Sequence, residues 1–368
     1  MGLSDRTVKY QIKPIIALPI IDKILIVRDT LGPDIEKVEY YSPPSWALKI
    51  SFIKTIYKLI LLLFLSFKEK PKLIHSYLLY PHGYLAFIIG KLTGCKIGVS
   101  LIAGPVEIFT FGKIPIGKYV YGKDLPTRTK KSKIIYKILN SFDIIIVAGS
   151  YTKKILTKEL IKKNKISIIP YIITDENCSP RNTNKIYDII YVGRLAKVKH
   201  IENIILIIKS LVKTYNMKNI KAAIIGDGPE KENLVSLVED YNLSKNIKFL
   251  GYKRNIGKFF NMSKLSIVTS ERETGPFTVL ESLKCGVPVV ASNCSDTIME
   301  ILTNGYNGYV IEDYEDIHGY SKKIYAALNN EQTINRLSKN SIKSVTFLSK
   351  KYVSKKWLRV FEKISVFR

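Results

Sequence analysis

Hydrophobic and polar positions follow a regular order along the second half of the chain. Short runs rich in β-branched residues end in glycine or a polar turn, and apolar residues at helical spacing follow each run. This alternation predicts βαβ units and a parallel, doubly wound sheet. The expected strands are 187–193, 221–225, 247–250, 265–269 and 287–291, and the expected helices are 200–215, 230–240, 255–262 and 277–284.

The first half carries the same pattern less regularly, with strands expected at 73–74, 97–102 and 144–148 and a helix at 84–93. The turn-forming residues of 175–185 predict a linker between two domains. We therefore place one domain at 1–172 and a second at 173–349. The basic, helical stretch 334–367 closes the chain, and we expect a C-terminal helix at 350–368 to pack back on the first domain.

A strongly apolar segment, residues 46–67, is long enough to be tested as a membrane span. Lys49, Lys54 and Lys58 lie within it, which argues against a span because charged side chains are costly in the bilayer. Two interpretations stay open. The segment is a core helix of the first domain, or it lies on a membrane surface with its lysines on the headgroups.

Composition narrows the class of protein. The 368 residues, 46% hydrophobic, suit two globular domains, and the four cysteines have neither metal nor redox spacing. We expect a reducing compartment and no signal peptide. The net charge of +27 attracts phosphorylated substrates, anionic lipids or nucleic acids, although a lysine-rich genome would give the same excess. The aromatic and basic interleaving of a nucleic-acid-binding sheet is not found.

Ligands of an open parallel sheet bind beyond the carboxyl ends of its strands, so the loops there carry the chemistry. The first loop holds Gly193, Arg194 and Lys199, and a guanidinium with an ammonium suits a diphosphate. The second is the tight turn at Gly226-Asp227-Gly228-Pro229.

The third loop contains two glutamates on either side of a helix start. Glu273 lies in the loop, Glu281 lies about one turn into the helix, and Gly275 turns the chain between them. The unpaired N–H groups of a helix start favour an anion, and carboxylates accept hydrogen bonds from vicinal hydroxyls. Together the three loops fit a nucleotide sugar.

The same motifs, in the same order, resemble the retaining glycosyltransferases of family 4, also called glycosyl transferases group 1. The motifs are 191–195 with Lys199, 225–229, 249–251, the pair Glu273 and Glu281, 285–292, and Glu300 with 304–308. The resemblance implies an α/β protein of the GT-B fold, with two Rossmann-like, doubly wound domains facing a central cleft. It also implies transfer, with retention, of a hexose-type sugar from a UDP- or GDP-linked donor to a glycan, glycolipid or lipid-linked acceptor. Neither a metal nor another cofactor is expected.

The resemblance also implies roles for individual residues. Arg194, Lys199 and Glu273 would be catalytic, the two cations by stabilising the departing diphosphate. The donor-binding set would be Gly193, Arg194, Lys199, Gly226, Asp227, Gly228, Glu273, Gly275, Pro276, Phe277, Thr278 and Glu281. Because proline has no N–H, a backbone donor at this helix start would come from Phe277 or Thr278. His82 and Glu107 are the candidates on the acceptor side. With the basic surface, this predicts a cytoplasmic enzyme, peripheral on the inner face of the cell membrane.

Two departures from the family pattern leave alternatives open. Ile102 stands where the family has a histidine near the reacting sugar, and residues 7–18 predict a helix where the family has its first strand. A start codon upstream of Met1, or a catalytically degenerate relative, would explain the second. An epimerase of nucleotide sugars is a further alternative, disfavoured by the scarcity of histidine.

Overall fold

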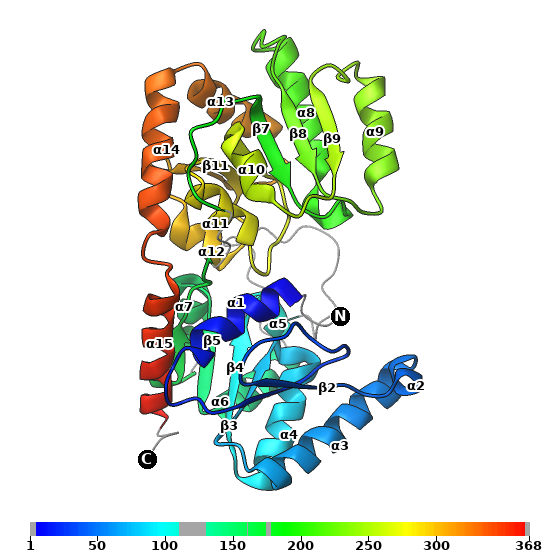
Figure 1. Ribbon diagram of the computed structural model, residues 1–368, viewed down its shortest axis with the longest axis vertical. Helices are drawn as coiled ribbons and strands as arrows, with labels where there is room; N and C mark the ends of the chain where they lie inside the picture. Colours follow the sequence, from blue (N-terminus) through cyan, green and yellow to red (C-terminus); the bar gives the residue numbers. More distant parts are fainter. Residues whose placement is uncertain (1–4, 110–129, 160, 174–177, 365–368) are drawn as a thin grey trace. The chain divides into compact units, whose positions relative to one another are not determined.

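A computed structural model describes residues 5–109, 130–159, 161–173 and 178–364 (Figure 1). The described chain divides into two compact units. One comprises the described residues of Met1–Pro115, Pro126–Thr174 and Leu348–Arg368, and the other those of Asp175–Phe347. The boundary expected at 172/173 lies beside this division. Part of the expected linker, residues 175–177, lies outside the described residues, as does Met1.

The second unit contains a six-stranded, wholly parallel sheet in the order β12-β11-β10-β7-β8-β9. Isoleucine, valine and alanine fill its central strands because both faces are covered by helices. The strands are β7 (Tyr187–Val192), β8 (Ala222–Ile225), β9 (Ile247–Gly251), β10 (Ser263–Val268), β11 (Val289–Ser292) and β12 (Gly308–Ile311). The strand order reverses between β7 and β10, which is the switch point of a doubly wound sheet.

The helices of this unit pack their apolar stripes on the sheet. In α8, the residues Ile201, Ile204, Ile205, Ile208 and Leu211 recur at helical spacing and are buried. The helices are η3 (Lys197–Lys199), α8 (Ile201–Lys213), α9 (Lys231–Asp240), α10 (Ile256–Asn261), α11 (Phe277–Lys284), α12 (Asp296–Ile301), α13 (Ile317–Leu328) and α14 (Glu331–Val345).

The first unit has a four-stranded parallel sheet in the order β3-β4-β5-β6 and a separate parallel pair, β1 and β2. Its strands are β1 (Ile24–Val27), β2 (Val38–Tyr41), β3 (Leu73–Tyr77), β4 (Lys96–Leu101), β5 (Ile144–Val147) and β6 (Ile166–Ile168). Its helices are α1 (Asp5–Ile16), α2 (Ser45–Leu48), α3 (Ser51–Glu69), η1 (Leu79–Gly83), α4 (Tyr84–Thr93), α5 (Val106–Phe109), α6 (Lys130–Asn140), α7 (Ser150–Lys158), η2 (Lys163–Lys165) and α15 (Lys350–Lys363).

The N-terminal segment forms α1, as the sequence predicts, and not a strand. Among the described residues, the strands β1 and β2 pair only with each other and lie outside the four-stranded sheet, which has β3 at one edge and β6 at the other. Neither strand was predicted from the sequence.

The helical stretch expected over 334–367 is divided between two helices, α14 and α15. The chain leaves α14 at Val345 and starts α15 after Ser349, whose hydroxyl accepts the Tyr352 N–H at 3.3 Å. α15 then packs in the first unit: Ser354 Oγ donates to the Pro14 carbonyl at 2.6 Å, and the Trp357 ring lies edge-on to His75.

The apolar segment 46–67 forms α2 and most of α3, and neither interpretation of it holds in full. Lys54 and Lys58 both pair with Asp29 and do not point outward, so the prediction that they contact headgroups is wrong. The core-helix interpretation holds for one face of α3 alone, because Leu65 is buried whereas Phe52 is 73% exposed and Ile60 61% exposed. Among the helices of the described residues, none is long and apolar enough to cross a membrane.

Candidate functional site: the switch point of the six-stranded sheet

The switch point lies where β7 and β10 are neighbours, and the loops that follow them meet there. The Glu271 N–H donates to the Val198 carbonyl at 3.1 Å, and the Thr269 hydroxyl donates to the carbonyls of Lys199 and His200. These bonds fix the loop after β10 against the loop after β7. Crevices at this position of doubly wound sheets bind ligands.

Lys199 and Glu273 form an ion pair at the meeting point of the two loops. Lys199 Nζ lies 2.7 Å from Glu273 Oε1, and the Ser270 hydroxyl donates to the same oxygen at 2.8 Å. The side chains are 20% and 15% exposed, so they are shielded from water yet reachable. The Glu273 N–H donates to the Cys294 carbonyl, which holds the carboxylate from the backbone side. Burial and, to a smaller extent, Glu273 raise the pKa of the Cys294 thiol to about 12, so this cysteine stays protonated.

The glycine turns allow the two loops after β7 and β8 to run in backbone contact. The Leu195 N–H donates to the Asp227 carbonyl at 3.0 Å. Gly226 has a φ of +142°, and a Cβ there would overlap the Gly193 carbonyl oxygen. Only glycine therefore fits this approach. Arg194, which follows Gly193, is exposed to solvent.

Asp227, the remaining residue of the glycine turn, keeps its side chain near its own loop. Its carboxylate accepts the Gly228 N–H at 2.8 Å and pairs with Lys231 at 3.5 Å, and its side chain is 58% exposed. These contacts of the Asp227 carboxylate stabilise the turn. The donor-binding role of Asp227 stays a prediction.

Glu281 is buried on α11, with only 1% of its surface exposed. Its helix begins directly after Gly275 and Pro276, as the sequence predicts. The Phe277 N–H donates to the Gly275 carbonyl at 2.8 Å, so this donor is used within the turn. Thr278, half-buried in the first turn of α11, is the other backbone donor that the sequence singled out.

A cluster around His200, which was not predicted from the sequence, adjoins Lys199 in the chain. His200 has a left-handed φ of +46°, its Nδ1 lies 2.9 Å from Glu202, and its ring stacks on Tyr314 with centroids 4.5 Å apart. The hydrogen bond to Glu202 raises the pKa of His200, and burial opposes that shift. Glu271, 3% exposed, lies 3.7 Å from His200 Nε2 and 3.2 Å from Arg272. His200 directly follows Lys199, and this proximity could have marked it as a candidate site residue. Tyr314 lies far along the chain, so its stacking on His200 could not be found from the sequence.

In the first unit, Glu107 joins two loops. Its Oε2 accepts the Leu79 N–H at 2.7 Å, and its Oε1 accepts the Ala103 N–H at 2.6 Å. Burial raises the pKa of Glu107 to about 7, although these N–H groups pull it down. Both carboxylate oxygens thus accept backbone hydrogen bonds, which indicates that Glu107 holds the two loops in position.

His82 and Ile102 also lie in these loops of the first unit. Burial lowers the pKa of His82 to about 4, so its imidazole is neutral near pH 7. Ile102 is half-buried, and its carbonyl accepts the Tyr171 hydroxyl at 3.3 Å.

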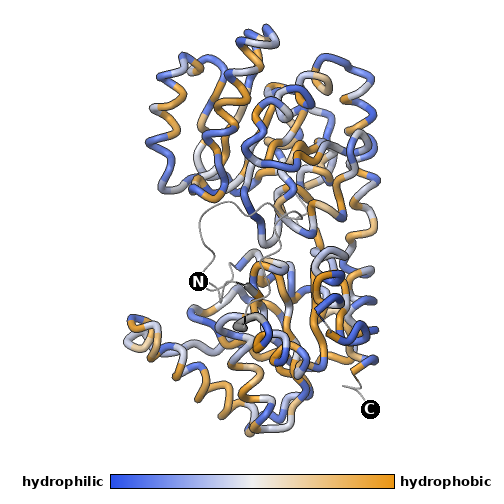
Figure 2. Tube along the Cα trace, turned by 180° about the vertical axis from the view of Figure 1, so that it is seen from behind, coloured by the Kyte–Doolittle hydropathy of each residue, from blue (hydrophilic) through white to orange (hydrophobic). Residues whose placement is uncertain are grey.

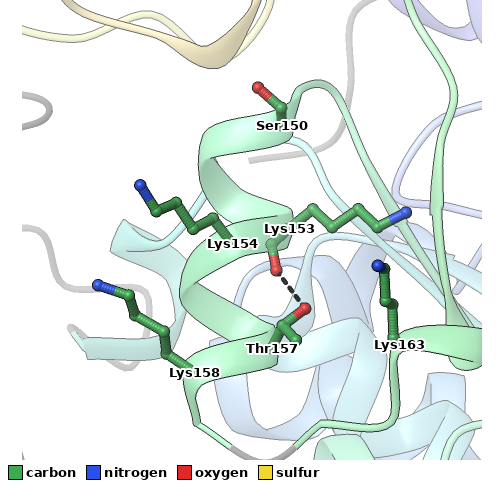
Figure 3. Close-up of a pocket in the computed structure, with 6 residues that line it drawn as sticks. All are labelled: Ser150, Lys153, Lys154, Thr157, Lys158 and Lys163. Carbon is green, nitrogen blue, oxygen red and sulfur yellow. Dashed lines mark hydrogen bonds between the residues drawn. The ribbon is translucent and has the colours of Figure 1, made fainter.

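A hollow on the surface of the first unit contains none of the predicted residues. It is lined by Ser150, Lys153, Lys154, Thr157 and Lys158 of α7 and by Lys163 (Figure 3). Lys153 and Lys163 extend toward each other in this view, and Lys154 and Lys158 point away. Within the described residues, no group of three or more His, Cys, Asp or Glu side chains could hold a metal ion.

Residues 174–344 match the family model of glycosyl transferases group 1. The second unit is a group 1 glycosyltransferase domain. The Lys199–Glu273 pair and the glycine turns therefore lie in this glycosyltransferase domain, at the switch point of its sheet.

Curated relatives extend the match into the first unit. N-acetyl-alpha-D-glucosaminyl L-malate synthase of Bacillus anthracis is 24% identical over 300 residues, which cover 78% of this chain and 74% of the relative. UDP-Gal:alpha-D-GlcNAc-diphosphoundecaprenol alpha-1,3-galactosyltransferase of Escherichia coli is 25% identical over 324 residues, which cover 83% and 78%. The similarity to glycosyltransferases therefore extends over both units of the chain.

Solved structures show the same fold. Anabaena HepE in complex with UDP superposes with a TM-score of 0.71 at 14% identity, covering 99% of this chain and 96% of the other. S. aureus TarM, in complex with fondaparinux, alpha-GlcNAc-glycerol and UDP, gives a TM-score of 0.64 at 20% identity. The match covers 83% of this chain but only 59% of the TarM chain. The predicted α/β class and GT-B fold are confirmed.

Proposed function

We propose that this glycosyltransferase moves a hexose-type sugar from a UDP- or GDP-linked donor to a glycan, glycolipid or lipid-linked acceptor, with retention and without a metal. The observation that carries the proposal is the Lys199–Glu273 pair at the switch point of the sheet, 2.7 Å apart and mostly shielded from water. A ligand bound at this pair would have one cation and one carboxylate within its reach.

The chemistry follows from the charges at this point. A sugar nucleotide departs as a diphosphate, and the negative charge that develops is stabilised by cations already in place. Exposed Arg194 and half-buried Lys199 supply those cations, so this site's own residues can stabilise the leaving group. Glu273, oriented by Ser270, would accept hydrogen bonds from sugar hydroxyls. Buried Glu281 would take the ribose hydroxyls.

The relatives support the donor and the acceptor class. The E. coli relative is named for UDP-galactose and a diphosphoundecaprenol acceptor, and the HepE structure contains UDP. A lipid-linked acceptor would bring this basic chain, of net charge +27, to an anionic membrane. We place the enzyme on the inner face of the cell membrane as a peripheral protein.

A donor screen tests the proposal. The full chain is titrated by calorimetry with UDP, GDP and their common sugar conjugates, with and without EDTA, beside Glu281→Ala. Binding of one nucleotide in the presence of EDTA, lost in the variant, is the expected result. An equally stable Glu281→Ala protein that binds as tightly as the parent would refute the donor site.

Transfer is then measured with the bound donor and lipid-linked acceptors, and the anomeric configuration of the product is read by NMR. An inverted product would overturn retention. Donor binding without any turnover would instead favour the degenerate relative, which the isoleucine at position 102 motivates.

A further inference from the structure

Helix α3 turns its apolar face outward. Phe52, Ile56, Ile60, Phe64 and Phe67 are between 40% and 73% exposed, and they recur every three or four residues, so they form one stripe. Helices on the surface of a globular protein usually bury such a stripe. Figure 2 shows the hydrophobic colour recurring along this helix.

The inward face of α3 carries two lysines that form ion pairs and a buried serine that forms a hydrogen bond. Lys58 is 5% exposed and pairs with Asp29, as does Lys54 at 3.0 Å. Ser66, also buried, donates to the Leu62 carbonyl. Burial acts to raise the pKa of the Asp29 carboxyl, but the contacts with Lys58 and Lys54 together outweigh it, so the pKa is lowered. This arrangement orients α3 and leaves the apolar stripe without a place in the core.

Neighbouring elements add to the apolar surface. Trp46 on α2 is 61% exposed, and Ile50, between α2 and α3, is 54% exposed. In α4, which contacts α3, Ile88 is 40% and Leu92 62% exposed. Large exposed apolar patches on soluble proteins indicate interaction surfaces.

Charge on and around this surface is positive. The one acidic residue of α3, Glu69, already lies near Lys23 and Lys68. Lys49 and Lys70, at the two ends of α3, are exposed and have no acidic partner among the residues that the structure describes. Two copies packed through this face would bring lysines together without carboxylates between them, whereas anionic headgroups would neutralise them.

We propose that the outward stripe of α3, with α2, is a membrane-binding surface that lies in the plane of a bilayer containing anionic lipids. The phenylalanine and isoleucine side chains would enter the boundary between headgroups and acyl chains, and the lysines at the helix ends would contact the headgroups. The helix of 19 residues would lie along the surface over roughly 28 Å. This inference deepens the membrane location proposed above and needs no sugar transfer for its test.

The test measures flotation of the full chain with vesicles, without donor or acceptor. One set is pure phosphatidylcholine, and the other is equimolar phosphatidylcholine and phosphatidylglycerol. The test variant combines Phe52→Ser, Ile60→Ser and Phe64→Ser, all exposed positions. The matched control combines substitutions of apolar residues exposed elsewhere: Ile134→Ser, Ile186→Ser and Tyr252→Ser.

The parent protein and the control are expected to float with anionic vesicles, and the test variant is expected to bind at least about tenfold more weakly. Lys49→Gln and Lys70→Gln should each weaken anionic-vesicle binding by about fivefold and leave binding to neutral vesicles unchanged.

Three outcomes would overturn the inference. In the first, the parent protein does not float with vesicles at low salt. In the second, the parent and the test variant float equally. In the third, the parent is a dimer and the test variant is a monomer. The last, seen by light scattering, would assign the surface to a second copy. UDP binding, measured on every variant, distinguishes failure of this surface from failure of the donor site.

Discussion

Replacing Glu273 by glutamine is expected to move donor binding and catalysis in opposite directions. The carboxylate lies 2.7 Å from Lys199 Nζ, and both side chains are mostly shielded. A nucleotide diphosphate competes with Glu273 for this ammonium. Removing the negative charge frees Lys199 for the phosphates, while any hydrogen bond of the carboxylate to the transferred sugar is weakened.

The magnitudes follow from the shielding. A partly shielded ion pair contributes about 1 kcal/mol, so Glu273→Gln should bind UDP about fivefold more tightly. A carboxylate contact made in the transition state is worth about 3–4 kcal/mol, so transfer should fall by roughly 10²- to 10³-fold. Lys199→Met removes a charge-assisted hydrogen bond of about 1.5–3 kcal/mol and should weaken UDP binding by roughly 10- to 150-fold.

Calorimetry with UDP and steady-state transfer assays measure the two effects separately. Glu232→Gln, on the exposed first turn of α9, is the matched control and should change neither. Weaker UDP binding in Glu273→Gln, together with unchanged transfer, would refute the reasoning. It would mean that Glu273 supports the nucleotide and has no part in the reaction.

Three further predictions concern stability. Gly226→Ala should lower the free energy of unfolding, measured by urea denaturation, by about 1–3 kcal/mol more than Gly251→Ala. Both glycines have a positive φ, but only a Cβ at position 226 would overlap backbone atoms. Glu107→Ala should cost about 2–5 kcal/mol in the same assay, since two loop N–H groups lose their acceptor; a loss below about 1 kcal/mol would contradict this. Burial lowers the pKa of His75 to about 4, so unfolded chains bind its proton first, and stability should fall as pH drops from about 6.5 to 4. His75→Gln should show a smaller fall, and an equal one would refute the assignment.

The local pattern of the sequence predicted most elements of the second unit and the positions of its loops. Helix α11 begins and ends where expected, and β7 differs from the predicted strand by one residue. Strand and helix periodicities are local properties, so they are recoverable from neighbouring residues. Glycine turns at strand ends likewise marked Gly193 and Gly226 before the structure showed their contact.

The first unit was less predictable because its elements depend on distant partners. In the part of the chain that the structure describes, the short strands β1 and β2 pair only with each other, and their four residues each are too few for a clear period. Glu107 was expected on the acceptor side, but its carboxylate binds two loop N–H groups from residues 79 and 103. No spacing rule connects a helix residue to those particular backbone groups.

By itself, the sequence determined the alternation of strands and helices, the glycine turns and the type of each charged side chain at a strand end. Only the tertiary structure decided that β10 lies beside β7, which brings Lys199 to Glu273 from loops far apart in the chain. It also decided that Asp29 draws Lys54 and Lys58 inward and so turns the apolar stripe of α3 to solvent. Periodicity records which residues share a face, but which neighbour covers that face depends on packing between segments distant in sequence.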